Sequence, residues 1–158
     1  MPRLVQYGSI SEGGRKKITL EEILSSCPDE HSRRLFDLLQ NTWINIGNQM
    51  VPATVGASFR ALVDRQGQPI FWAYPDSLQA AFSVLLKAGA PTDNVERYRS
   101  AVAAISGFNT QKVLKESQPI TKWSSLTDDA IRAFVSESQL LVDAWRKSTT
   151  PRTGSARS

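Results

Sequence analysis

Few side chains in this sequence could do chemistry on a substrate. His31 is the single histidine and lies beside Asp29 and Glu30, so it could act as a general base that a carboxylate orients. No serine or cysteine nucleophile motif accompanies it, and we therefore interpret it as a surface histidine in the charged first turn of a helix. Cys27, the single cysteine, ends a short apolar run, which is typical of a small buried thiol and not of a nucleophile. We expect no catalytic residue and no enzyme.

The sequence also lacks the motifs that bind cofactors and metals. It contains no GxGxxG, P-loop or GxSxG pattern, and Gly13-Gly14 leads into a lysine pair without the strand and first glycine of a phosphate loop. A disulfide framework needs two cysteines in one chain, and a zinc site needs about four ligands, mainly cysteine and histidine. We therefore expect no cofactor and no metal.

An acidic pair near the C-terminal end is a further candidate site. Asp128 and Asp129 could form an acid/base couple, a metal clamp or a helix-capping device. Neighbouring helical positions diverge by about 100°, so two adjacent carboxylates do not converge easily on one ligand, and capping is the favoured interpretation. Arg132, one turn further on, can pair with either carboxylate, or it can face a phosphate while a carboxylate holds it in place.

The charge of the chain is distributed unevenly. The 158 residues include 19 Lys and Arg against 15 Asp and Glu, a formal net charge of +4. Residues 1–19 carry +3, residues 146–158 carry +4, and the eleven basic and fourteen acidic side chains of residues 20–145 give −3. We expect a flexible basic arm over 1–18 and a disordered basic tail over 148–158. These ends are either solvated tails or contacts to nucleic acid or another acidic surface.

Apolar residues between these ends recur mainly at helical spacing. Thr19 and Glu22 form a capping-box pattern that opens a short helix to about Cys27. A longer amphipathic helix follows, with Pro28 at its first helical position and its end near Gly47. Thr127 is placed to cap the last helix, which has acidic residues in its first turn and basic residues in its last. Further segments are expected as helices over 75–89, 92–107 and 127–147, and as a long ordered loop with a short helical piece over 108–123.

Residues 58–74 follow a different pattern, which predicts a β-hairpin. Apolar runs over 58–63 and 70–74 flank a turn-forming segment, in which Gly67 suits a position with positive φ. A helix over 55–63 is the alternative interpretation.

Together these elements predict a mainly α fold. We expect a four-helix bundle over residues 19–147, with a small β-hairpin between helices two and three and flexible basic termini. The four tryptophans are interpreted as core or interface anchors: Trp43, Trp72, Trp123 and Trp145. The first eight residues lack the apolar stretch of a signal peptide, and no run approaches the roughly 20 apolar residues of a membrane span, so we expect a soluble chain with no membrane partner.

The order of these features resembles the coat proteins of rod-shaped, tobamovirus-like plant RNA viruses. Four stretches carry the likeness: residues 22–27 with 34–43, the hairpin 59–74, the segment 74–86, and 127–130 at the start of the last helix. The chain departs from that family just before the acidic pair, where it has Lys122 in place of arginines. It also has a basic tail where the family has a phenylalanine-acidic-tryptophan segment.

The resemblance implies a viral coat (capsid) protein, found in the virion and the host cell cytoplasm, that forms a helical homopolymer around single-stranded genomic RNA. Packaging without sequence readout needs phosphate neutralisation by arginine and lysine. The candidate RNA-binding residues are Arg60, Arg97, Arg99, Lys122, Asp128 and Arg132.

Two other functions remain open from the sequence. The first is a small nucleic-acid-binding accessory or regulatory helical protein that does not polymerise, for which binding should depend steeply on salt. The second is an adaptor that presents an apolar helix face to a protein partner, for which binding should survive high salt.

Overall fold

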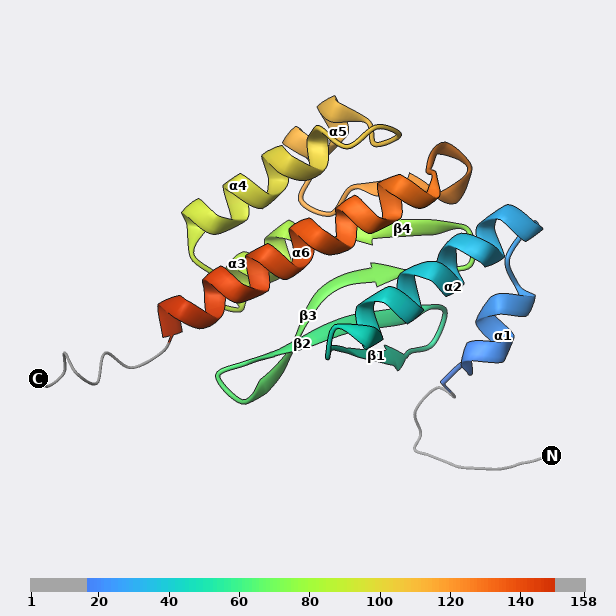
Figure 1. Cartoon of the computed structure of the whole chain (residues 1–158), viewed down its shortest axis with the longest axis horizontal. Coiled ribbons are helices and arrows are strands. Elements are labelled where there is room, and N and C mark those ends of the chain that lie inside the picture. Colours follow the sequence, from blue (N-terminus) through green and yellow to red (C-terminus); the bar gives the residue numbers. More distant parts are fainter. Residues whose placement is uncertain (1–16, 150–158) are drawn as a thin grey trace, which may run out of the picture.

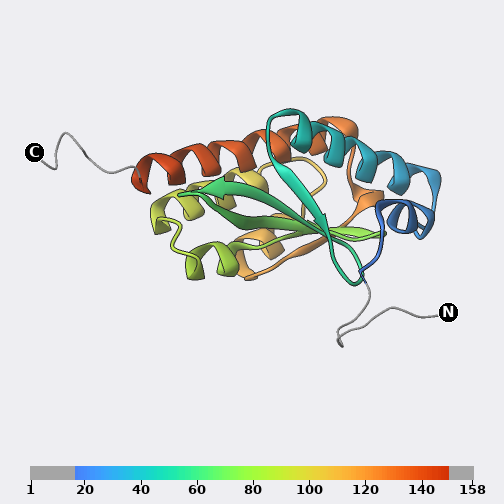
Figure 2. The same cartoon turned by 90° about the horizontal axis from the view of Figure 1, so that it is seen from below.

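A five-stranded antiparallel sheet lies at the centre of the molecule and supports a layer of helices. The computed structural model describes residues 17–149. The strands follow one another in chain order across the sheet, from β1 at one edge to β5 at the other. Figures 1 and 2 show α2 and α6 lying beside each other along one face of the sheet, with α4 next to α6. The elements are α1 (Leu20–Ser25), α2 (Glu30–Asn45), β1 (Gln49–Pro52), β2 (Ala57–Val63), β3 (Gln66–Ala73), β4 (Ser77–Ala80), α3 (Phe82–Lys87), α4 (Thr92–Ala103), α5 (Thr110–Lys115), β5 (Ile120–Lys122), the 3-10 helix η1 (Trp123–Ser125) and α6 (Asp128–Thr149).

The predicted four-helix bundle with one small hairpin is therefore wrong. Among residues 17–149 there are six α-helices and five strands, and the sheet, not a helix pair, forms one whole side of the core. The error begins at residues 75–89, where Leu78 and Phe82 fit a helical stripe. Residues 77–80 instead form β4, because Leu78 and Ala80 also alternate with Gln79 and can pair with strands on both sides. Tertiary pairing overrides local helical spacing here.

Several predicted helix boundaries are confirmed. Thr19 and Glu22 form the full capping box of α1, with the Glu22 amide donating to Thr19 Oγ1 at 3.1 Å and the Thr19 amide donating to Glu22 Oε1 at 2.8 Å. The Ala130 amide donates to Thr127 Oγ1 at 3.2 Å, so Thr127 caps α6 as expected. Of the predicted loop over 108–123, the helical piece is α5, but residues 120–122 pair with β4 as the edge strand β5.

The predicted hairpin is confirmed as β2 and β3, although its turn differs from the prediction. Val63 pairs with Gln66, so the loop has two residues, Asp64 and Arg65, both with positive φ (54° and 69°). This is the primed turn geometry that matches the right-handed twist of a hairpin. Gly67 lies within β3 and does not take the positive φ that its type suggested.

Aromatic side chains fill the space between the sheet and the helices. Phe71 of β3 stacks on Phe59 of β2 with ring centroids 4.9 Å apart, and it meets Phe134 of α6 edge-on at 4.8 Å. Trp43, Trp123 and Trp145 are buried in this core, as predicted, and the first two donate their indole N–H to backbone carbonyls. Trp72 is only half-buried, so the core interpretation does not hold for it.

The predicted arms lie almost entirely outside the described residues. Residues 148 and 149 are helical and continue α6, so the last helix is two residues longer than expected. At the other end, the Ile18 amide donates to the Ala53 carbonyl at 2.8 Å, which ties the chain before α1 to the β1–β2 loop. That contact places Lys17 beside the sheet.

Candidate nucleic-acid interface

The six predicted RNA-binding residues do not gather on one surface, and most have intramolecular partners. Arg97 of α4 pairs with Glu137 of α6 at 3.3 Å, and Lys122 of β5 pairs with Asp76 at 3.4 Å. These pairs are exposed and therefore contribute little to stability, but each lowers the free positive charge of its cation.

Arg99 serves as a structural support for α5. Its side chain is only 13% exposed, and its guanidinium lies 4.4 Å from the centre of the Phe82 ring. Arg99 Nη1 donates to the Val113 carbonyl at 2.8 Å and to the Glu116 carbonyl at 2.9 Å, which satisfies acceptors at the end of α5. Because of these contacts, the Arg99 guanidinium mainly stabilises the packing of α5 and Phe82.

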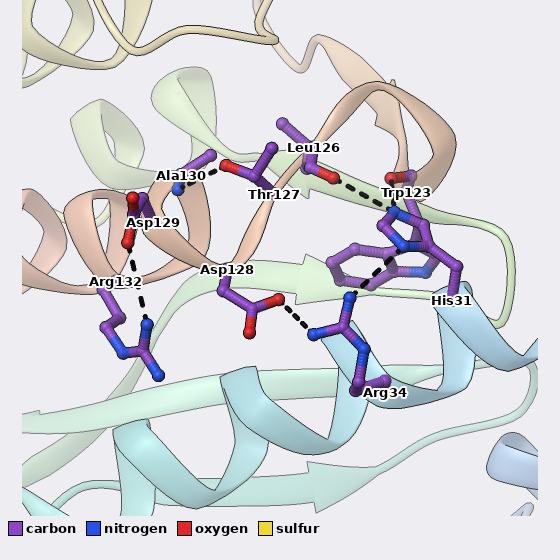
Figure 3. Close-up of polar contacts among 9 residues, drawn as sticks. All are labelled: His31, Arg34, Trp123, Leu126, Thr127, Asp128, Asp129, Ala130 and Arg132. Carbon is purple, nitrogen blue, oxygen red and sulfur yellow. Dashed lines mark hydrogen bonds and ion pairs between the residues drawn. The ribbon is translucent and has the colours of Figure 1, made fainter.

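Polar contacts join the start of α6, and the segment just before it, to α2 (Figure 3). His31 Nε2 lies 3.0 Å from the carbonyl oxygens of both Trp123 and Leu126. Carbonyls only accept, so Nε2 carries the proton, and Nδ1 can accept from Arg34, 3.4 Å away. Arg34 in turn pairs with Asp128. The predicted surface histidine is thus half-buried and holds the segment that leads into α6.

Arg132 lies one helical turn beyond Asp128. It pairs with Asp129 at 3.8 Å, the first of the two roles that its spacing allowed, and it remains 58% exposed. Asp128 and Asp129 point to different partners, as expected for adjacent helical positions. Within residues 17–149, both carboxylates at the start of α6 are therefore paired with arginines.

Arg60 has a different environment, because it lies on the face of the sheet away from α2 and α6. Residues that pair across an antiparallel sheet share a face. The register places Arg60 opposite Gln49, and Ser58 opposite Trp72, which in turn pairs with Gln79. We call this surface the open face: its members by register include Gln49, Val51, Ser58, Arg60, Pro69, Trp72, Gln79 and Ile120.

Contacts from both strands hold the backbone at Arg60. The β2–β3 register shifts beside it, because Phe59 pairs with Phe71 and Arg60 with Pro69, which leaves one additional residue on β3. The indole N–H of Trp43 donates to the Gln49 and Arg60 carbonyls, both at 3.1 Å, and so fixes the backbone on both strands. Arg60 Nε donates to Ser58 Oγ at 2.9 Å. Ser58 thus holds the guanidinium at Nε, and no group within residues 17–149 accepts a hydrogen bond from its other N–H groups.

A hollow of about 410 Å³ opens beside Arg60, and we call it the Trp72 hollow. Its lining residues are Lys17, Val51, Pro52, Ala53, Thr54, Ser58, Arg60 and Trp72. The indole N–H of Trp72 has no acceptor among residues 17–149, unlike those of Trp43 and Trp123. The hollow is thus lined by an aromatic side chain together with two cations.

Lys17 and Arg60 form no ion pair with any residue in the described part of the chain. Residues 17–149 contain fourteen basic and fourteen acidic side chains, so this segment as a whole has no excess charge. Local attraction for an anion therefore depends on cations that no carboxylate neutralises. Of the predicted cations, Arg60 is the one that meets this condition within residues 17–149.

Sequence reasoning missed Trp72 and Lys17 as site residues. The pattern Phe71-Trp72-Ala73 offered one signal, because alternate residues of a hairpin strand face opposite sides of the sheet. If Phe71 and Ala73 face the core, Trp72 faces away from it. No local signal identified Lys17, since its position depends on the Ile18 contact with the β1–β2 loop.

Next to the Trp72 hollow, Asp76 and Tyr74 have shifted pKa values. The Ser77 hydroxyl, and then Lys122, hold the pKa of Asp76 below its ordinary value. Burial raises the pKa of Tyr74, whose hydroxyl donates to Gln79 Oε1 at 2.9 Å. Around neutral pH, Asp76 is therefore ionised and Tyr74 is neutral.

Comparisons with protein-family models, characterised proteins and solved structures found no match to this chain. Within residues 17–149, no helix is both long enough and apolar enough to cross a bilayer. The same residues contain no cluster of three or more His, Cys, Asp or Glu side chains that could hold a metal ion.

Proposed function

We propose that this protein binds single-stranded RNA on the open face of its sheet, without reading base sequence. Arg60 and Lys17 contact phosphates, and a base stacks on Trp72. The observation that supports this best is the Trp72 hollow itself, which is lined by a half-buried indole and by two cations without a carboxylate partner in residues 17–149.

A single strand fits this surface better than a duplex does. Stacking on an aromatic side chain requires an unstacked base, which a single strand presents at little cost. Every base has a π-face, so stacking tolerates any sequence, and phosphate contacts carry no sequence information. The chemistry of the hollow therefore favours RNA packaging or protection over recognition of one site.

We further propose that the protein acts as a coat subunit, which assembles as a helical homopolymer around genomic RNA in the virion and the host cell cytoplasm. The basic ends of the sequence and the resemblance at the confirmed hairpin support this role. Head-to-tail contacts that do not close produce filaments, so a small domain can build a rod.

The observed fold removes the architectural part of the coat-protein resemblance, so a non-polymerising function is the second candidate. The sheet-and-helix architecture differs from the four-helix bundle that the coat-protein resemblance implied. A nucleic-acid-binding accessory protein would use the same hollow and the same cations, but it would remain a monomer or dimer on RNA. The two functions therefore differ in assembly and not in the RNA contact.

Two measurements on the full chain test these proposals. Fluorescence anisotropy with a labelled single-stranded RNA should show that Arg60→Gln weakens binding, whereas Arg97→Gln, which removes the same charge from the helical layer, leaves it close to wild type. Equal effects of both variants would contradict binding at the open face. Negative-stain micrographs of protein mixed with RNA should show rods or filaments, and discrete monomeric particles across pH and salt would favour the accessory function.

A further inference from the structure

A second hollow lies next to the first, and it is larger and more apolar. It measures about 690 Å³, and its lining includes Val55, Tyr74, Pro75, Asp76, Ile120 and Lys122. We call it the Tyr74 hollow. Its volume lies within the usual range for sites that bind small organic groups.

Both hollows belong to the same side of the sheet. Ile120 pairs with Gln79, which pairs with Trp72, so Ile120 and Trp72 share the open face. The β1–β2 loop separates the hollows, because Thr54 lines the first and Val55, the next residue, lines the second. A chain that leaves one hollow across this loop enters the other.

The floor of the Tyr74 hollow is held from the core side. The Trp123 indole donates to the Tyr74 carbonyl at 2.9 Å, and the Trp123 amide donates to the Asp76 carbonyl at 3.2 Å. The Tyr74 amide also donates to the Ser77 carbonyl at 2.7 Å, which closes the turn between β3 and β4. The hollow is therefore formed before any ligand binds, which lowers the entropy cost of binding.

The lining matches a flat apolar group. Val55 is 59% exposed and Ile120 is 44% exposed, so both present apolar surface to solvent beside Tyr74. Lys122 and Asp76 also line the hollow, but they pair with each other at 3.4 Å, so together they add no net charge. A nucleobase, which is flat and uncharged, meets this requirement.

We infer that the Tyr74 hollow binds the base of a second nucleotide on the same RNA strand. This inference rests on the proposed function. Arg60 on β2 and Ile120 on β5 are three strand spacings apart, about 14 Å at the usual inter-strand distance. The ligand is then a single strand of several nucleotides that crosses the sheet, and neither a mononucleotide nor a duplex can occupy both hollows.

The inference can be tested with the double variant Val55→Thr/Ile120→Thr. Both side chains are exposed and β-branched, and the substitutions keep that shape, so the fold should persist. The probes are uridine monophosphate, oligouridylates of increasing length, and a duplex RNA of matched length. Trp72→Ala is the reference for the first hollow, and Leu140→Gln, an exposed apolar residue on α6, is the matched control.

The double variant should weaken binding of the longer oligouridylates at least about fivefold and leave monophosphate binding unchanged. Trp72→Ala should weaken both, and the duplex should bind the wild type less tightly than the single strand. If the double variant binds long oligouridylates like the wild type while Trp72→Ala does not, the second subsite is refuted and the proposed function stands. If neither variant weakens binding, both are refuted. Equal binding of duplex and single strand would also overturn the inference.

Discussion

Substitutions in the Trp72 hollow should separate the contribution of charge to RNA affinity from the contribution of base stacking. Replacing Lys17 and Arg60 by glutamine removes two cations that have no carboxylate partner among residues 17–149. Each phosphate contact on a single strand contributes about 0.7 to the slope of log affinity against log salt, so the double variant should lose roughly 1.4. Trp72→Ala should leave that slope unchanged and cost about 1–3 kcal/mol, which is roughly a 5- to 150-fold loss of affinity.

The assay is an anisotropy titration of the full chain with a labelled single-stranded RNA at several salt concentrations. Because residues 1–16 and 150–158 are the same in every variant, the differences isolate the hollow. Arg97→Gln is the charge-matched control and should keep the wild-type slope. An unchanged slope in the Lys17/Arg60 variant, or a salt-dependent loss in Trp72→Ala, would refute these roles.

Three further predictions concern the scaffold that holds the site. Gly56→Ala should lower the free energy of unfolding by about 1–3 kcal/mol in urea titrations, because a Cβ there would overlap a β3 carbonyl; unchanged stability would contradict this close approach. Tyr98→Phe should cost about 1–3 kcal/mol by leaving the buried Ser138 hydroxyl without its 2.6 Å partner, and adding Ser138→Ala should restore part of the loss; simple additivity would argue against this coupling. Asp76 has a lowered pKa, so its stabilising contribution is complete above its ordinary pKa and is lost as pH falls through the lower folded value. Thermal melts should therefore show a shallower acid loss for Asp76→Asn, whereas an identical acid profile would contradict the stabilisation of the Asp76 carboxylate by the Ser77 hydroxyl and Lys122.

The helices were the most predictable part of this fold. α2 and α6 each bury one apolar stripe, and Thr19 and Thr127 mark helix starts through local capping chemistry. The edge strands were not predictable in the same way. β1 and β5 have four and three residues, too few to establish an alternating pattern, and they form only because a neighbouring strand offers hydrogen bonds. Residues 77–80 fitted both the helical spacing and the alternation of a strand, and pairing with β3 and β5 decided in favour of the strand.

The candidate site was less predictable than the fold. Sequence counting could identify Arg60 as a cation, but it could not show that Arg97 and Lys122 have carboxylate partners from distant segments. The register shift opposite Arg60 depends on how β2 and β3 pair, which no local pattern specifies. His31 looked like a surface residue because its carbonyl partners lie more than ninety residues later in the chain.

Mapping where RNA touches the protein shows directly whether the open face is the binding surface. The wild-type chain would be crosslinked to single-stranded RNA by ultraviolet light, digested, and examined by mass spectrometry for peptides that carry a nucleotide. Binding at the open face predicts crosslinks in the peptides that contain Arg60 and Trp72. Crosslinks confined to α4 and α6, or to residues 1–16 and 150–158, would contradict it.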